Sequence, residues 1–137
     1  MEWTGGCLCG AVRYRLASDP VEAGWCQCRT CQLNSGSPAM AFAAVPVDDY
    51  VVEQGEALIG RIASSDFGHR LFCGACGTPL AMEVDDEPVT IDFSVATLDD
   101  PNAVPPEFHI FHGSKIAWFE TADDLPRHER SRPKGRD

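Results

Sequence analysis

The sequence predicts a mainly β domain, and three observations lead to this prediction. Short apolar segments recur along the chain, and 12 glycines and 10 prolines separate many of them. No long stretch has the apolar spacing of an amphipathic helix. The length of 137 residues suits one domain with one core. Short strands joined by Gly/Pro turns are typical of β domains, so we expect one domain of that class.

The expected elements follow in chain order. Residues 12–16 alternate apolar and basic side chains, as in a strand with one buried face. Pro20 and Gly24 indicate a loop before the central cysteines, and residues 29–35 could form a helical turn that Gly36 closes. Residues 39–45 read as a buried strand that ends at Pro46. Later strands are expected at 57–63, 70–73, 79–84, 89–95 and 105–111, with an acidic hairpin turn at 85–88.

Charge and hydropathy exclude several functions. The net charge is −10, which argues against nucleic acid bound along a broad basic face. No apolar run approaches the roughly 20 residues that span a bilayer, and the first residues do not resemble a signal peptide, so we expect a cytoplasmic protein without membrane partners. Residues 126–137 hold five basic and two acidic side chains and are expected to form a solvated, disordered tail.

Seven cysteines form three groups along the chain. An odd total and pairs only one residue apart favour metal binding over a disulfide framework. Thiolates select zinc, copper(I) or iron–sulfur clusters, and these spacings do not match ferredoxin patterns, so zinc is the predicted metal. The groups are Cys7 with Cys9, the triplet Cys26, Cys28 and Cys31, and Cys73 with Cys76.

A closed tetrahedral zinc site needs four ligands. Cys73 and Cys76 supply two, and the other two come either from Cys7 and Cys9 or from the triplet. In the first case the triplet remains as a site of three thiolates with one open position. Three protein ligands and a vacancy are typical of a catalytic zinc.

The motifs together resemble one known family. It is the glutathione-dependent formaldehyde-activating enzyme family, which also contains the centromere protein V domain. The resemblance covers about residues 5–125 and the motifs occur in family order. They are Gly6-Cys-Leu-Cys-Gly10 with Val12 and Tyr14, Cys26-Gln-Cys-Arg-Thr-Cys31 with Ser35-Gly36, Ser64-Ser65, Arg70, Phe72-Cys-Gly-Ala-Cys-Gly-Thr-Pro-Leu80, Leu98-Asp-Asp-Pro101, His109-Ile-Phe111, Ser114-Lys115 and Trp118.

The resemblance implies a zinc-containing β-tent fold of short antiparallel strands in a domain of residues 1–125. It implies two zinc ions, a structural one on Cys7, Cys9, Cys73 and Cys76 and a second one on the triplet, where chemistry occurs. Because three ligands chelate less strongly than four, we expect the second ion to be held more weakly or to be absent. The implied activity is that of a carbon–sulfur lyase that joins formaldehyde to glutathione as S-hydroxymethylglutathione. The expected partners are therefore a small thiol such as glutathione and an aldehyde.

Four side chains are candidates for substrate binding. Glutathione carries two carboxylates, which need cationic or backbone donors. Arg29 lies inside the triplet loop, and Lys115 and His112 lie in the late motif. Gln27 stands where the family often has histidine, and it can orient a group but cannot titrate near neutral pH. Arg70 is expected to brace a strand.

Two other functions fit the same residues. The chain could be a zinc-stabilised binding module without catalysis, or a redox-sensitive protein whose triplet releases zinc on oxidation. An open site with a pocket beside the triplet would favour the enzyme, whereas a buried fourth ligand would favour the binding module.

Overall fold

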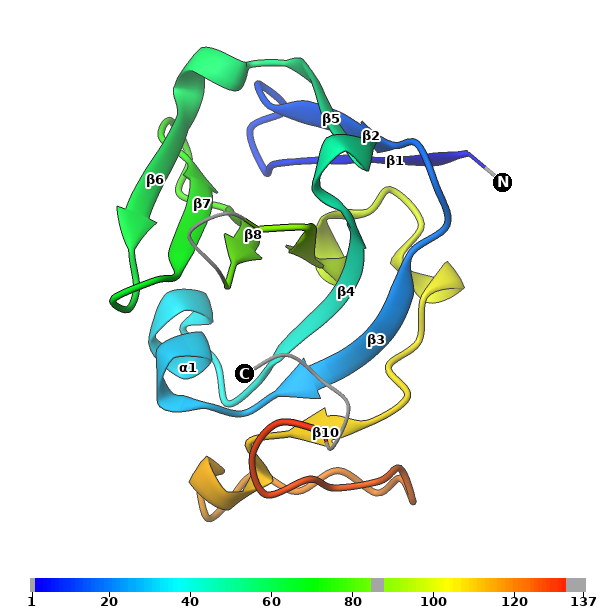
Figure 1. Cartoon of the computed structure of the whole chain (residues 1–137), viewed down its shortest axis with the longest axis vertical. Coiled ribbons are helices and arrows are strands. Elements are labelled where there is room, and N and C mark those ends of the chain that lie inside the picture. The colour runs from blue at the N-terminus through cyan, green and yellow to red at the C-terminus, as the bar shows by residue number, and fades with distance from the viewer. Residues whose placement is uncertain (1, 85–87, 133–137) are drawn as a thin grey trace.

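The computed structural model describes residues 2–84 and 88–132, which form two β-sheets (Figure 1). A small sheet has the strand order β1-β2-β5, and a larger one has the order β10-β3-β4-β9-β8-β7-β6. Neighbouring strands are antiparallel except β10 and β3, which are parallel. The predicted mainly β class is confirmed. The strands are β1 Trp3–Gly6, β2 Arg13–Leu16, β3 Val21–Cys26, β4 Met40–Pro46, β5 Tyr50–Gln54, β6 Ile59–Ala63, β7 His69–Cys73, β8 Pro79–Glu83, β9 Thr90–Ser94 and β10 His109–Ile110.

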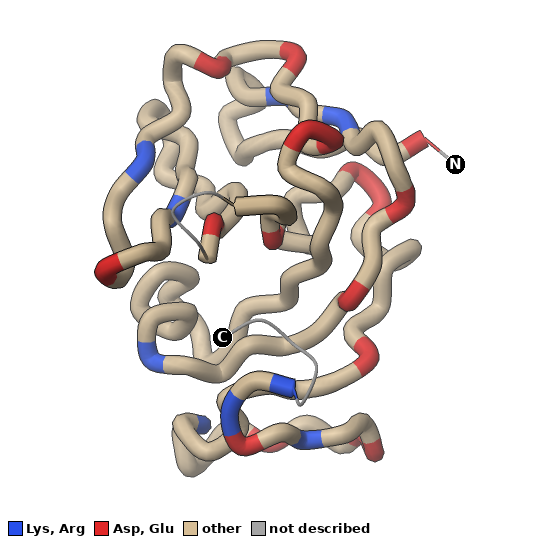
Figure 2. The backbone as a smooth tube through the Cα atoms, in the orientation of Figure 1, with Lys and Arg blue, Asp and Glu red and all other residues tan. Residues whose placement is uncertain are grey.

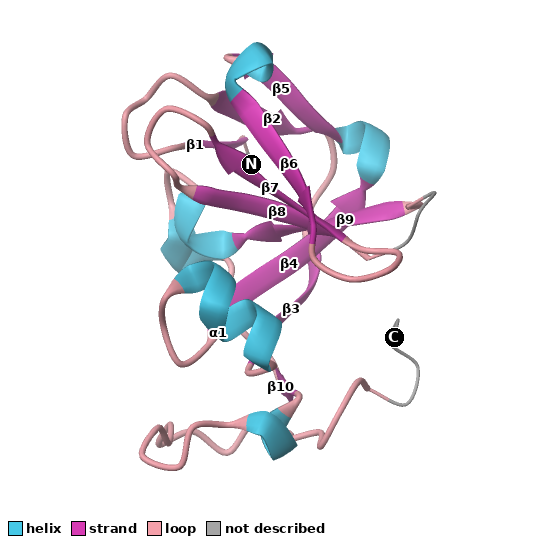
Figure 3. Cartoon of the chain, turned by 90° about the vertical axis from the view of Figure 1, so that its left-hand side faces the viewer, coloured by secondary structure: helices cyan, strands magenta, loops and turns pink. Residues whose placement is uncertain are grey.

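Helical structure in the described residues is short. The α-helix α1 (Arg29–Ser35) connects β3 to β4, and both Figure 1 and Figure 3 place it beside the ends of these strands. Gly36 closes it in the left-handed conformation, as the sequence predicts. Single 3-10 turns are η1 Val47–Asp49, η2 Glu56–Leu58, η3 Val95–Thr97, η4 Pro101–Ala103 and η5 His112–Ser114. No helix of the described part is long and apolar enough to cross a membrane.

An aromatic cluster joins the two sheets in the core. Tyr14 of β2 stacks on Tyr50 of β5 with 4.6 Å between ring centroids. Both rings lie 6.3 Å from Phe93 of β9, which is completely buried. The Tyr14 hydroxyl shares a 2.7 Å hydrogen bond with Thr97 Oγ1, so its polar end has a partner inside the core. This packing holds the small sheet against the large one. The first cysteine pair lies in the loop that connects β1 and β2 of the small sheet.

The segment before the central cysteines is a strand, whereas the sequence indicates a loop there. β3 runs through Gly24 and pairs with β4 on one side and β10 on the other. Gly24 is needed because a Cβ at this position would lie 2.4 Å from the Phe108 ring. The glycine therefore permits close packing of an aromatic side chain and does not end the strand. β1 and β5 are further strands that the sequence analysis does not predict.

Several expected boundaries also shift. The strand expected at 57–63 begins with the turn η2, and only Ile59–Ala63 pairs with β7. The strand expected at 105–111 is reduced to His109–Ile110. β8 and β9 pair antiparallel as a hairpin would, while residues 85–87 of its acidic turn lie outside the described residues.

Residues 126–132, here called the C-terminal segment, are ordered against β10 and do not form the expected disordered tail. The N–H of His109 donates to the carbonyl of Pro126, and the N–H of His128 donates back to the carbonyl of His109. Phe111 N–H likewise donates to the carbonyl of Arg130. The charged side chains of this segment suggest a solvated tail, but they do not predict backbone pairing. The backbone hydrogen bonds form along the free edge of β10. Residues 133–137 of the expected tail lie outside the described residues.

Charged residues occur in most parts of the chain that the structure describes (Figure 2). Acidic residues lie on both sheets and in several loops, whereas the C-terminal segment brings basic residues close to β10 and β3 (Figure 2). One of these, Arg132, forms an ion pair with Glu22 of β3. The segment expected to be separate from the domain therefore contributes charge to its surface.

Candidate metal centres and active-site pocket

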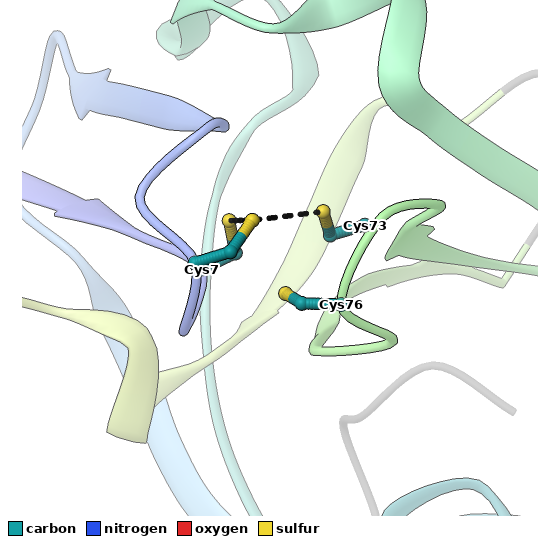
Figure 4. A group of neighbouring side chains, drawn as sticks. Cys7, Cys73 and Cys76 are labelled. Carbon is teal, nitrogen blue, oxygen red and sulfur yellow. Dashed lines mark hydrogen bonds between the residues drawn. The ribbon is translucent and has the colours of Figure 1, made fainter.

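Four cysteines from two hairpin loops meet at one place (Figure 4). Cys7 and Cys9 lie between β1 and β2, whereas Cys73 ends β7 and Cys76 lies in the turn before β8. The Sγ atoms of Cys7 and Cys9 are 3.6 Å apart, and those of Cys9 and Cys73 are 3.9 Å apart. We call these residues the four-cysteine cluster. The structure thus joins the first cysteine pair to the last, one of the two alternatives that the spacing leaves open.

Each pair is shaped by a tight turn that ends in a glycine. The Gly10 N–H donates to the Cys7 carbonyl over 3.1 Å, and the Gly77 N–H donates to the Cys73 carbonyl over 2.7 Å. Both glycines have positive φ, at 78° and 83°, where a side chain would be strained. The Thr78 hydroxyl lies 3.2 Å from the Cys76 sulfur, and it acts together with backbone contacts from Thr78 and Cys9 to lower the pKa of that thiol to about 5. The two loops therefore present their sulfurs to a common point.

The sulfur positions fit a tetrahedral zinc ion. All four ligand atoms lie within 4.8 Å of one another. Zinc–sulfur bonds of about 2.3 Å in a tetrahedron place sulfurs about 3.8 Å apart, close to the 3.6 and 3.9 Å found here. The four-cysteine cluster could therefore hold a metal ion, and its all-sulfur ligand set is consistent with zinc.

The cysteine triplet forms where β3 passes into α1. Cys26 is the last residue of β3, Cys28 is the N-cap of α1, and Cys31 lies in the first helical turn. The Cys31 N–H donates to the Cys28 sulfur over 3.3 Å, so the sulfur caps the helix. The strand end and the helical turn bring all three sulfurs within 4.8 Å of one another. This group could also hold a metal ion, with three protein ligands instead of four.

A buried arginine lies against the triplet. Arg70 of β7 is only 8% exposed, and its Nη1 donates to the Cys31 sulfur over 3.4 Å. Contacts from Cys26 and Cys31 lower the pKa of the Cys28 thiol, and the nearby Arg70 lowers it further. The same contact with Cys28 raises the pKa of Cys26. The environment therefore favours negative charge on the Cys28 sulfur, whereas the pKa of the Cys26 and Cys31 thiols is raised.

A cavity of about 200 Å³ opens beside the triplet. All three triplet cysteines and Arg70 line it. Apolar walls come from Phe42, Met82, Phe108, Ile110 and Phe111, and charged groups near it include Glu22 and Arg132. The four-cysteine cluster does not contribute to the lining among the described residues. The two cysteine groups thus differ in the part of the chain that the structure describes, since the triplet lines this cavity and the four-cysteine cluster does not.

Three of the predicted substrate-binding residues lie elsewhere. Arg29 is exposed on α1, and its Nη1 donates to Gln32 Oε1 over 3.1 Å. Lys115 Nζ lies 3.4 Å from Glu120, and His112 Nε2 lies 4.0 Å from the same side chain. None of the three lines the cavity. A role for them in substrate binding stays a prediction.

The fourth predicted residue, Gln27, is buried behind the triplet. It is 2% exposed, and its Nε2 lies 3.0 Å from Nδ1 of the completely buried His109. The other ring nitrogen of His109 lies 3.2 Å from Asp123. When Gln27 donates to Nδ1, Nε2 donates to the Asp123 carboxylate. Gln27 therefore positions a buried histidine, and it does not line the cavity.

Sequence reasoning missed the residues that give the pocket its charge. Arg70 is expected to brace a strand, yet its guanidinium contacts a triplet sulfur. Glu22 and Arg132 are not singled out, because one lies in an expected loop and the other in an expected tail. Glu22 and Phe111 both adopt positive φ without being glycine, and both line the cavity. Sequence offers no signal for such backbone conformations at non-glycine residues.

The fold and the cysteine groups define a class of protein: a mainly β domain with a four-cysteine cluster and a separate three-cysteine site at a pocket. The sequence model of one family, described as glutathione-dependent formaldehyde-activating enzyme, matches residues 2–114. The chain therefore belongs to the glutathione-dependent formaldehyde-activating enzyme family.

Individual relatives agree with this assignment. A Schizosaccharomyces pombe protein named an uncharacterized lyase is 37% identical over 79 residues, which is 58% of this chain and 56% of that protein. A Halomonas elongata protein, named a putative glutathione-dependent formaldehyde-activating enzyme, is 29% identical over 125 residues, covering 85% of this chain and 78% of the relative. The match spans little more than half of the yeast protein's length.

A solved structure shows the same fold. The crystal structure of a Rhodobacter sphaeroides protein superposes with a TM-score of 0.59 at 23% sequence identity. The match covers 70% of this chain and 87% of that one. At this level of identity the likeness concerns the fold alone.

Proposed function

We propose that the chain is a zinc-dependent carbon–sulfur lyase that forms and cleaves the bond between a small thiol and formaldehyde. The single observation that carries the proposal is that the triplet lines a cavity that also contains a buried arginine. The family match and the lyase name of a relative support the reaction class. Glutathione is the thiol that the family name suggests.

The reaction is a simple addition whose atoms balance. The thiol sulfur forms a bond to the carbonyl carbon, and the carbon–oxygen double bond becomes a single bond. The thiol proton ends on the oxygen, which becomes a hydroxyl group. The product is S-hydroxymethylglutathione when glutathione is the thiol, and the reverse reaction cleaves the same carbon–sulfur bond. Zinc held by the triplet would supply a Lewis acid and would lower the pKa of a nearby thiol.

The chain's own residues would create the conditions for this reaction. Cys26, Cys28 and Cys31 would hold the metal with an open side toward the cavity. The Arg70 guanidinium, 3.4 Å from Cys31 Sγ, offsets the negative charge that three thiolates bring to this site. The aromatic and aliphatic walls would limit the access of water, and this would strengthen electrostatic interactions inside the cavity.

The cavity also favours an enzyme over a binding module without catalysis. A closed structural site needs no adjacent space, and the four-cysteine cluster serves as an internal comparison, since it lies outside the cavity lining. A second group that could hold metal beside a lined cavity is what an enzyme of this type requires.

The proposal is tested by exchange NMR on formaldehyde and glutathione. We expect the zinc-loaded protein to accelerate exchange between free glutathione and its hydroxymethyl adduct. Cys28→Ser removes one triplet ligand, and its exchange rate should return to that of the reaction without protein, while thermal melting shows a folded domain. Equal rates with and without the parent protein would contradict the proposed activity, and acceleration by Cys28→Ser equal to that of the parent would contradict the assignment to the triplet.

A further inference from the structure

A pair of opposite charges lies at the accessible side of the same cavity. Arg132 Nη2 and Glu22 Oε1 are 3.0 Å apart, and both residues line the cavity with the triplet. Their side chains are 28% and 44% exposed, whereas Arg70 is buried. The Arg132 guanidinium also lies 4.2 Å from the centre of the Phe108 ring, which forms one wall. A charged pair that solvent can reach therefore lines the cavity beside one of its apolar walls.

Two separate features of the fold bring this pair together. Glu22 has φ of 56°, an uncommon conformation for a residue with a side chain, at a point where the register of β3 against β4 shifts. Arg132 follows the backbone ladder between the C-terminal segment and β10. The family match ends at residue 114, so Arg132 lies outside the part of the chain that the family model describes.

The other charges at the cavity have partners of their own. Glu83 accepts from Arg61 over 3.0 Å, and Arg70 donates to the triplet. Asp92 is buried and also has a partner. Glu22 and Arg132 thus present one carboxylate and one guanidinium side by side, both within reach of solvent.

We propose that Glu22 and Arg132 form a specificity site that recognises the amino-acid end of the thiol substrate. An α-amino-acid group carries an ammonium and a carboxylate on the same carbon. Its ammonium is complementary to Glu22, and its carboxylate is complementary to the Arg132 guanidinium, which can bind carboxylates through two parallel hydrogen bonds. The thiol would then extend along the cavity toward the triplet. This inference rests on the proposed function, and it names thiols with a zwitterionic amino-acid group, glutathione among them, as the substrate class.

The pair has little value as a purely structural element. A partly exposed ion pair contributes little to stability, because water and salt screen it and two long side chains must be ordered. The C-terminal segment is already held by backbone hydrogen bonds to residues 109–113. Stability therefore does not explain why these two residues are paired here, whereas recognition of a ligand does.

The test compares two thiols by calorimetry on the zinc-loaded protein. The ligands are glutathione and des-amino glutathione, which lacks only the α-ammonium. We expect the parent to bind glutathione about ten-fold more tightly, the lower end of what a charge-assisted hydrogen bond contributes. Glu22→Gln should abolish this preference. A preference that persists in Glu22→Gln, or that is absent in the parent, would overturn the proposal.

A second set of variants tests Arg132. The quantity compared is the ratio of the affinity for glutathione to the affinity for the neutral thiol 2-mercaptoethanol. Arg132→Gln should lower this ratio about ten-fold. Arg130→Gln is the matched control, since Arg130 is an exposed arginine of the same segment outside the cavity lining. It should retain the parental affinity ratio. An equal effect of both substitutions would show a general charge effect and contradict a specific site.

A charge-swapped variant separates recognition from folding. Glu22→Arg combined with Arg132→Glu keeps the attraction between the C-terminal segment and β3 but exchanges the positions of the two charges. We expect melting close to that of the parent together with loss of the glutathione preference. Parental preference in this variant would assign the pair a structural role only. Calorimetry measures binding, so it tests this inference independently of catalysis. If exchange NMR shows no acceleration, the proposed function fails, and the binding result still stands.

Discussion

The Nη1 atom of Arg70 lies 3.4 Å from the sulfur of Cys31, and this contact connects the two cysteine groups through a single strand. β7 carries Arg70 as its second residue and ends at Cys73, a member of the four-cysteine cluster. A metal ion bound by the four-cysteine cluster would therefore help to fix the strand that places a buried cation against the triplet.

Replacement of Arg70 should weaken the triplet site. Arg70→Met keeps much of the side chain's length but removes the donor to Cys31, and we expect a loss of about 1–3 kcal/mol in the free energy of unfolding. The zinc content at the triplet should fall as well, because the negative charge of the thiolates loses its partner. Urea unfolding and metal analysis measure the two effects.

Arg61→Met is the matched control for this substitution. Arg61 lies on the neighbouring strand β6, and its partly exposed side chain pairs with Glu83. We expect Arg61→Met to change the unfolding free energy by less than about 1 kcal/mol. Two zinc ions per chain and parental stability in Arg70→Met would show that the contact with Cys31 is incidental.

Removal of metal should occur in two steps. Four ligands chelate more strongly than three, and the triplet opens to a cavity, so its zinc should be lost first during titration with a chelator. We expect the first zinc to leave with the domain still folded by circular dichroism, and the second to leave together with unfolding. Loss of both ions in one transition that coincides with unfolding would contradict the distinction between the two sites.

The buried contact between Gln27 and His109 should contribute to stability. Gln27→Leu leaves Nδ1 of a completely buried histidine without its partner, at an expected cost of about 1–3 kcal/mol. Gln54→Leu serves as control, because Gln54 of β5 is exposed and makes only long, solvent-exposed hydrogen bonds of 3.4 and 3.3 Å to the carbonyls of Gly10 and Ala11, and its loss should cost less than about 1 kcal/mol. Urea unfolding at neutral pH measures both. Equal stability of the two variants would exclude a positioning role for Gln27.

The carboxylate-binding role predicted for Arg29 is tested beside that of Arg132. Arg29 is exposed and donates to Gln32, whereas Arg132 lines the cavity. We therefore expect Arg132→Gln to reduce glutathione affinity more than Arg29→Ala does, and both variants should melt near the parental temperature. A larger loss in Arg29→Ala, measured by the same calorimetry, would place the carboxylate anchor on α1.

Much of the site's framework could be predicted from sequence, because thiol spacing depends on local chain geometry. A pair of cysteines two or three positions apart can chelate one ion only through a tight turn, and the turns at Gly10 and Gly77 have that form. The helical turn closed by Gly36 and the buried strand ending at Pro46 follow from equally local rules. Which cysteine groups combine into one site is a long-range property. Spacing leaves two combinations open, and the resemblance to the family predicts the one that the structure shows.

The residues that were not predicted depend on contacts between distant segments. In the sequence Gly24 has the pattern of a loop residue, because its contact with the distant Phe108 ring is visible only in the structure. Arg132 resembles part of a solvated tail until backbone hydrogen bonds align its segment with β10. Arg70 has the sequence context of any strand residue, and only the packing of β7 near α1 brings its guanidinium to a sulfur. Sequence patterning does not encode such pairwise distances.

Mapping of glutathione binding by amide chemical shifts tests most directly whether the pocket beside the triplet is the site of thiol–aldehyde chemistry. We predict that glutathione added to the zinc-loaded, nitrogen-15-labelled protein shifts the amide signals of Thr30, Phe42 and Ser65, which line the cavity. Signals of Leu8 and Ala75, in the loops of the four-cysteine cluster, should stay in place. Shifts confined to those two loops, or no shifts at saturating glutathione, would contradict the account.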